Sequence, residues 1–206
     1  MTSIYALKSR FQNLLRPIVN ELVRIGVTAN QVTVTALLLS LGAGCLIAWT
    51  HGGRMLLLLP IVLLVRMALN AMDGMLAREH NQVSALGAIL NELGDVISDI
   101  SLYLPLAVVP GFDPRLVVAV VILSILTEMA GVIAIQIGAS RRYDGPLGKS
   151  DRAFLFGIMG LLLGFGVRID RVIPYVLVAM IFLLLLTIVN RVRQALKQVS
   201  ASGAKQ

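Results

Sequence analysis

Six stretches of apolar residues alternate with short polar segments along the chain. They cover roughly residues 32–50, 55–77, 86–109, 116–139, 153–167 and 172–189. About 20 apolar residues are needed for a helix to cross the hydrocarbon core of a bilayer. Polar residues interrupt the second and third stretches, and the fifth is short. An extended backbone cannot satisfy its polar groups in hydrocarbon, so the pattern predicts an all-α fold, an integral membrane bundle of six transmembrane helices.

The first 30 residues follow a different pattern. Apolar side chains recur at helical spacing between Ile4 and Leu22, with Lys8, Arg10 and Arg16 among them. Such a segment lies in the membrane interface with its cations against anionic headgroups. We therefore expect an N-terminal amphipathic juxtamembrane segment over 1–30, a membrane domain over 31–195 and a flexible C-terminal tail over 196–206.

Composition and charge narrow the class of protein. The chain is 57% hydrophobic and only 14% charged, which excludes an ordinary soluble domain. Its net charge of +7 is spread between apolar runs rather than over one soluble face, so no nucleic acid partner is expected. With six spans, thirteen Lys and Arg residues fall on one side, four on the other, and Arg66 within a span. The positive-inside rule then places both termini in the cytoplasm.

Polar residues within the second and third runs form two stripes. Arg66, Asn70 and Asp73 are spaced by four and three, and Asn91, Asp95 and Asp99 by four, so each set occupies one helix face. A short loop around residues 80–84 brings the two faces together near the cytoplasmic surface. Ionisable groups inside spans suggest function, although pairing across helices, such as Arg66 with Asp73, is the simpler alternative. Oxygen ligands without His or Cys suit Mg²⁺ or Mn²⁺.

At these residues the chain resembles the CDP-alcohol phosphatidyltransferases. The family signature is Asp-x2-Asp-Gly-x2-Ala-Arg-x8-Gly-x3-Asp-x3-Asp. This chain keeps every spacing and has two departures, both Asp to Asn, in the sequence Asn70-x2-Asp73-Gly74-x2-Ala77-Arg78-x8-Gly87-x3-Asn91-x3-Asp95. Two weaker similarities are the segment 28–33 before the first span and the segment 148–152 entering the fifth.

The resemblance implies transfer of a phosphatidyl group from CDP-diacylglycerol, or a related CDP-linked lipid, to an alcohol with release of CMP. It implies that Asn70, Asp73, Asn91 and Asp95 hold one or two divalent ions and that Asp95 is the general base. It also places Gly74, Ala77, Arg78 and Gly87 around the cytidine diphosphate. The two amides remove two negative charges, so we expect weaker metal affinity than four carboxylates would give.

The acceptor alcohol is not identified by the sequence. Arg141, Arg142, Lys149 and Arg152 either bind an acceptor phosphate or serve only as a positive-inside flank. Glu128, mid-span in the fourth run, contacts either the site or a neighbouring subunit. Gly160 and Gly164 allow close helix contact, either inside the chain or in a homodimer.

Three functions are therefore open. An active transferase of phospholipid synthesis in a bacterial-type inner membrane, with its site on the cytoplasmic side, fits the signature best. A catalytically inactive homologue that binds nucleotide or lipid is supported by the two Asn residues. A small membrane transporter would more naturally show broken helices or inverted repeats, and neither is visible.

Overall fold

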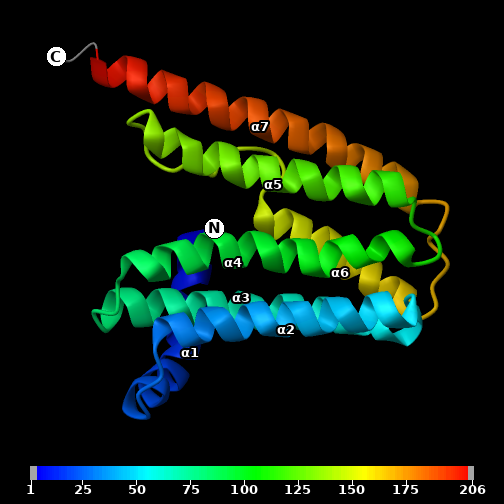
Figure 1. The fold of residues 1–206 in the computed structure, drawn as a ribbon, viewed down its shortest axis with the longest axis horizontal. Helices are drawn as coiled ribbons and strands as arrows, with labels where there is room; N and C mark the ends of the chain where they lie inside the picture. The colour runs from blue at the N-terminus through cyan, green and yellow to red at the C-terminus, as the bar shows by residue number, and fades with distance from the viewer. Residues whose placement is uncertain (1–3, 204–206) are drawn as a thin grey trace. The chain divides into compact units, whose positions relative to one another are not determined.

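The computed structural model describes residues 4–203 of the chain (Figure 1). Within this range the protein is all-helical, with seven α-helices and two short 3₁₀ helices. In chain order these are α1 (Ile4–Arg24), α2 (Ala29–Thr50), η1 (Gly53–Leu57), α3 (Leu58–Glu79), α4 (Ala85–Tyr103), η2 (Leu104–Val108), α5 (Pro114–Gln136), α6 (Lys149–Gly164) and α7 (Ile173–Gly203). The expected all-α membrane bundle is confirmed.

Two helix ends differ from the apolar pattern. The third run divides at Tyr103, where α4 ends and η2 begins, with Pro105 in the first turn of η2. Proline lacks an N–H group and its ring clashes with the preceding turn, so the α-helix does not continue through it. At the other end of the chain, α7 continues past the apolar run to Gly203, so residues 196–203 are helical where we expected a tail. Residues 204–206 lie outside the described range, and the flexibility of the tail stays a prediction.

Four helical segments are long and apolar enough to cross a membrane. They are Ala29–Thr50, Gly53–Glu79, Pro114–Gln136 and Ile173–Ala201. Helix α4 is not apolar enough to be among them because it contains the charged residues Glu92, Asp95 and Asp99. Helix α6 is not long enough, since it has only 16 residues. Four of the six predicted spans are therefore supported by length and composition, and the crossing of α4 and α6 stays a prediction.

The chain divides into two compact units, and the first comprises residues 1–43 and 61–101. Its core joins Leu15 and Val19 of α1 to Met72, Met75 and Leu76 of α3. Arg16 Nη2 lies 3.1 Å from Glu79 Oε1 and ties α1 to the end of α3. Leu14 and Ile18, on the outer face of α1, are 73% and 51% exposed. An interfacial helix with apolar groups directed at lipid has this pattern.

The second unit comprises residues 44–60 and 102–206. Helix α5 packs along α7, and α6 packs against η1. A Cβ added at Gly160 would lie 3.1 Å from the Leu56 carbonyl oxygen, and one at Gly164 would lie 2.7 Å from the Leu57 side chain. The two glycines of α6 therefore serve an internal contact. Tyr103 and Phe156 stack with ring centroids 4.2 Å apart.

Candidate functional site

The predicted polar stripes meet in the first unit, where α3 and α4 are joined by the loop that follows Glu79. Asn70 Nδ2 donates a hydrogen bond to Asp95 Oδ1 at 2.9 Å, so the two helices are linked at the first and last positions of the signature. Asp73 lies about one turn after Asn70 on α3, and Asn91 about one turn before Asp95 on α4. The convergence of all four side chains on one ion stays a prediction.

Arg66 is the centre of the ion pairing between these helices. Its Nη1 lies 2.6 Å from Asp99 Oδ1, and its Nη2 donates to both the backbone oxygen of Asp95, at 2.9 Å, and Asp95 Oδ1, at 3.3 Å. The side chains of Arg66 and Asp99 are 4% and 8% exposed, whereas that of Asp95 is 24% exposed. Arg66 thus pairs with the α4 carboxylates, and of these Asp95 is the one that solvent or substrate can reach.

The start of α2 completes this region. Thr28 and Gln31 exchange hydrogen bonds between their side chains and backbone N–H groups, which forms a capping box. One turn later, Thr33 Oγ1 donates to Asp73 Oδ2 at 2.8 Å, and Asp73 is buried. Gln82, in the α3–α4 loop, accepts a hydrogen bond of 2.7 Å from the Ala29 N–H group. The weak sequence similarity in 28–33 therefore corresponds to direct contacts with the signature.

Two signature glycines lie under polar side chains. A Cβ at Gly87 would lie 2.8 Å from Asn30 Oδ1 and 3.0 Å from Ser84 Oγ, and one at Gly74 would lie 2.8 Å from Arg78 Nη2. Absence of a side chain lets these groups approach the helix backbone. Ala77 is half-buried against the first unit's apolar core. The described contacts therefore place Arg78 above Gly74, and Asn30, which sequence reasoning missed as a site residue, above Gly87.

The donor atoms of the first unit fit a hard cation in their chemistry. Asp95 and Asp99 pair with Arg66, and Asp73 accepts a hydrogen bond from Thr33. Carboxylate and amide oxygens are the ligands that Mg²⁺ and Mn²⁺ prefer. Nevertheless, among residues 4–203 no three His, Cys, Asp or Glu side chains are grouped closely enough to hold an ion by themselves. Any ion would therefore depend on the amide oxygens of Asn70 or Asn91, or on substrate oxygens.

A second polar cluster lies in the second unit, around Glu128 of α5. Its Oε1 lies 3.0 Å from Arg152 Nη2, and its Oε2 lies 3.4 Å from Arg191 Nη1 and 3.7 Å from Arg141 Nη2. We call Glu128, Arg141, Arg152 and Arg191 the guanidinium cluster. Three arginines therefore share the Glu128 carboxylate. The sequence predicted that Glu128 contacts either the site or a neighbouring subunit, and the structure shows it paired with arginines of its own unit.

The arginines of this cluster differ in exposure. Arg152 is fully buried and also donates to Thr127 Oγ1 at 3.2 Å, and Arg191 is 2% exposed. Arg141 is 23% exposed and has the longest distance to Glu128. Arg191 donates to the Thr127 carbonyl oxygen as well. Of the three, Arg141 is therefore the best placed to contact a solute.

The remaining basic residues of the α5–α6 loop have local partners. Arg142 forms a two-pronged pair with Asp144, with distances of 2.7 and 2.9 Å, and also donates to Gln198 at 3.1 Å. Lys149 begins α6, where the Gly148 N–H group donates to Asp151 Oδ2 at 2.8 Å. The segment 148–152 is thus the capped N-terminus of α6, which places Lys149 and Arg152 on its first turn.

Arg191 and the α5–α6 loop can both approach α5 because residue 131 is a glycine. The Arg142 N–H group donates to the Gly131 carbonyl oxygen at 3.1 Å. A Cβ at position 131 would lie 2.6 Å from the Arg142 carbonyl oxygen and 3.2 Å from Arg191 Nη1. Only glycine gives both groups this approach. Arg191 and Gly131 were missed by sequence reasoning, and the available signal was that Arg191 comes just after the long apolar run of α7.

Comparison with known proteins agrees with these observations. Residues 26–200 match the CDP-alcohol phosphatidyltransferase family. The chain is 54% identical over 159 residues to inner membrane protein YnbA of Escherichia coli (strain K12), covering 77% of this chain and 79% of that protein.

Solved structures with the same fold include the phosphatidylinositol phosphate synthase PgsA1 of Mycobacterium tuberculosis. Its complex with manganese and citrate has a TM-score of 0.71 at 19% identity, covering 87% of both chains. Its structure with CDP-DAG bound has a TM-score of 0.64 at 24% identity, covering 89% of this chain and 92% of that one. The family match spans most of the sequence and includes both polar regions described above. The chain therefore belongs to the CDP-alcohol phosphatidyltransferase family.

Proposed function

We propose that this protein is an active CDP-alcohol phosphatidyltransferase, which moves a phosphatidyl group from CDP-diacylglycerol or a similar CDP-linked lipid to an alcohol and releases CMP. The observation that carries the proposal is the Asp95 carboxylate. It is oriented by Arg66 and Asn70, yet its side chain remains 24% exposed, in the signature position of a general base. A carboxylate kept only for helix packing has no need of that exposure.

In the proposed reaction, the acceptor hydroxyl oxygen attacks the phosphorus that bears the diacylglycerol. The new P–O bond forms as the bond between that phosphorus and the CMP oxygen breaks, and CMP leaves with the electron pair. Asp95 takes the hydroxyl proton, which requires only that the hydroxyl lies within hydrogen-bond reach. Arg66 and Asn70 hold the carboxylate in place, since both donate to the same oxygen.

Other residues of the first unit bind the CDP moiety in this proposal. Arg78 lies over Gly74 and offers a guanidinium to a phosphate, and Gly87 lets the polar side chains of Asn30 and Ser84 approach the helix backbone, where we propose that they and Ala77 lie beside the nucleotide. A Mg²⁺ or Mn²⁺ ion, held by Asp73 and Asp95 with the amide oxygens of Asn70 and Asn91, would neutralise diphosphate charge when bound. The manganese of the PgsA1 complex supports this choice of ion.

For the acceptor, we propose a phosphorylated alcohol whose phosphate binds the guanidinium cluster. The three guanidiniums grouped around Glu128 offer several N–H donors of the kind that bind phosphate. Arg141 makes the direct contact, and the buried Arg152 acts by orienting Glu128. Lys149, at the start of α6, assists in this proposal, whereas Arg142 is held by Asp144.

The membrane arrangement completes the proposal. Helices α4 and α6 cross the bilayer with the four apolar spans, which makes six crossings and places both termini and the site on the cytoplasmic side. The relative YnbA is an inner membrane protein, and we propose the same location for this chain. A homodimer is compatible with the proposal, although the Gly160–Gly164 face is already used internally.

The test is CMP release by purified protein supplied with CDP-diacylglycerol, Mg²⁺ or Mn²⁺ and a panel of free and phosphorylated alcohols. Asp95→Asn should lower turnover by about 10²–10⁴-fold, the usual contribution of a general base. Asp99→Asn is the matched comparison, because it alters the same Arg66 pairing one turn further along α4. Equal losses in both variants would assign Asp95 a packing role and remove it as the base.

The second candidate is an inactive homologue that binds a CDP-lipid without turnover. The specific observation in its favour is that Asn70 donates an N–H to Asp95 instead of adding a carboxylate. On this view the protein would bind CDP-diacylglycerol, yet no alcohol in the panel would lead to CMP release with either metal. Release of CMP that depends on Asp95 would eliminate it.

A further inference from the structure

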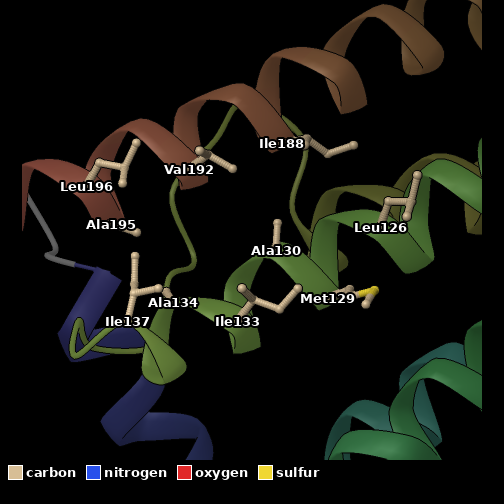
Figure 2. A pocket seen from close by; sticks show the side chains of 10 residues that line it. All are labelled: Leu126, Met129, Ala130, Ile133, Ala134, Ile137, Ile188, Val192, Ala195 and Leu196. Carbon is tan, nitrogen blue, oxygen red and sulfur yellow. The ribbon is translucent and has the colours of Figure 1, made fainter.

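An apolar groove runs between α5 and α7 in the second unit, and none of the residues that line it belongs to the guanidinium cluster. Its volume is about 290 Å³, and every side chain that lines it is apolar (Figure 2). Neither the proposed reaction nor the polar site uses this groove. Its helices are the two most apolar candidate spans, Pro114–Gln136 and Ile173–Ala201. We therefore expect the open side of the groove to face membrane lipid.

The shape of the groove comes from small residues between large ones. Ala134 of α5 and Ala195 of α7 are almost fully buried where the helices touch, and they form its floor with Ala130. Met129 and Leu196, each 55% exposed, rise on either side as walls. Because Ala134 and Ala195 are already covered by each other's helix, a helix of a second copy would find no small-residue seam for close packing here.

The length of the groove matches one leaflet of a bilayer. Leu126 and Ile137 line it at opposite ends of the α5 side, eleven residues apart, as Figure 2 shows. At about 1.5 Å per residue this is about 16 Å, which is half of the hydrocarbon thickness of about 30 Å. A single acyl chain that enters from one surface therefore ends where the groove ends.

Cations mark the end at which the headgroup would lie. Arg193 and Lys197 are exposed on α7, each one residue beyond the groove residues Val192 and Leu196. They follow one another at a spacing of four, so they form a stripe along the groove's edge at its Ile137 end. By the positive-inside rule this end faces the cytoplasm. An anionic phosphate headgroup there is attracted by both charges.

We propose that the α5–α7 groove is a binding site for one acyl chain of an anionic phospholipid of the cytoplasmic leaflet. The acyl chain fills the space above Ala130, Ala134 and Ala195, and the phosphate lies beside Arg193 and Lys197. The occupant is a resident lipid, bound by apolar contact along the chain and by charge at the headgroup. The site is independent of Asp95 and of the proposed transfer.

The experiment uses the full chain reconstituted in vesicles that contain phosphatidylglycerol with a photoreactive group on its acyl chain. After irradiation, lipid adducts are mapped by mass spectrometry. We expect them to concentrate on 126–137 and 188–196, above the level on other exposed spans such as α2. Ala130→Leu fills the groove and should reduce these adducts to the level of α2. Ala179→Leu, the same change at an exposed α7 position outside the groove, should leave them unchanged.

A second pair of measurements tests the headgroup. The same photoreactive acyl chain on phosphatidylcholine should label the groove less than on phosphatidylglycerol, and Arg193→Gln with Lys197→Gln should remove the difference. Adducts spread evenly over all exposed spans, with no effect of Ala130→Leu, would overturn the proposal. So would cross-links from the groove to a second chain, because a homodimer would then be the occupant. Circular dichroism of each variant is the control, and an unchanged helical spectrum means that a loss of labelling reports on the groove.

Discussion

Replacement of Arg66 by methionine tests the arrangement of the first unit most directly. Arg66 makes three contacts with α4, at 2.6, 2.9 and 3.3 Å, and its side chain is 4% exposed. Methionine keeps much of the apolar length but leaves Asp95 and Asp99 without this cation. Removal of one partner from a buried ion pair costs about 3–5 kcal/mol. We therefore expect Arg66→Met to lower the free energy of unfolding by about that amount.

A control variant and a double variant make this prediction specific. Arg24→Met removes an arginine of the same unit that is 80% exposed and pairs with Glu21 at 3.6 Å, and exposed pairs contribute about 1 kcal/mol or less. Adding Asp99→Asn to Arg66→Met removes one of the two stranded carboxylates. The double variant should therefore be less destabilised than the sum of the single variants, by about 0.5–3 kcal/mol.

The assay is reversible unfolding in mixed micelles, followed by far-ultraviolet circular dichroism for the parent, the three single variants and the double variant. If Arg66→Met is no more destabilising than Arg24→Met, the buried ion pair does not hold α3 to α4. Additive effects of Arg66→Met and Asp99→Asn would also refute the reasoning, because the two residues would then not act on each other.

Two further predictions concern charge in the two clusters. In the double variant Asn70→Asp with Asn91→Asp, a lower Mn²⁺ concentration should be enough to raise the thermal unfolding midpoint. The metal-free double variant should be less stable than the parent because like charges are added. An unchanged metal dependence would mean that neither amide lies near an ion. Glu128→Gln removes the carboxylate that Arg141, Arg152 and Arg191 share, so the variant should be less stable than the parent in buffer and gain more stability from inorganic phosphate. A thermal titration with phosphate measures this, and equal phosphate dependence in both proteins would mean that the guanidinium cluster binds no anion.

The helices and the contact between the polar stripes were predictable because local periodicity determines both. Apolar runs of bilayer length define helices by the requirement for internal hydrogen bonding. A spacing of three and four residues places Asn70 on the polar face of α3 and Asp95 on the polar face of α4. The short loop after Glu79 lets these faces meet, as the 2.9 Å hydrogen bond between the two side chains shows. Every part of this inference lies within one hairpin.

What the sequence did not reveal depends on residues far apart in the chain. Thr33 contacts Asp73 across forty positions, and Arg191 contacts Glu128 across sixty-three. No spacing rule links such residues. The simpler alternative named Arg66 with Asp73 as an example of an ion pair, and the structure shows Arg66 paired with Asp95 and Asp99 of α4. The end of α4 at Tyr103 was missed because the run of apolar residues continues through Pro105.

The chemistry of the two clusters offers a physical reason to treat both as sites. In the first unit, two aspartates pair with Arg66, and in the second, three arginines pair with Glu128. Ionisable side chains within a membrane protein are costly and therefore suggest function. In the proposed reaction, the carboxylates of the first unit would bind a divalent cation and the guanidiniums of the second unit would bind a phosphate. Asn70 and Asn91 supply amide oxygens without adding charge, so the departures from the family signature are consistent with a working site of lower charge.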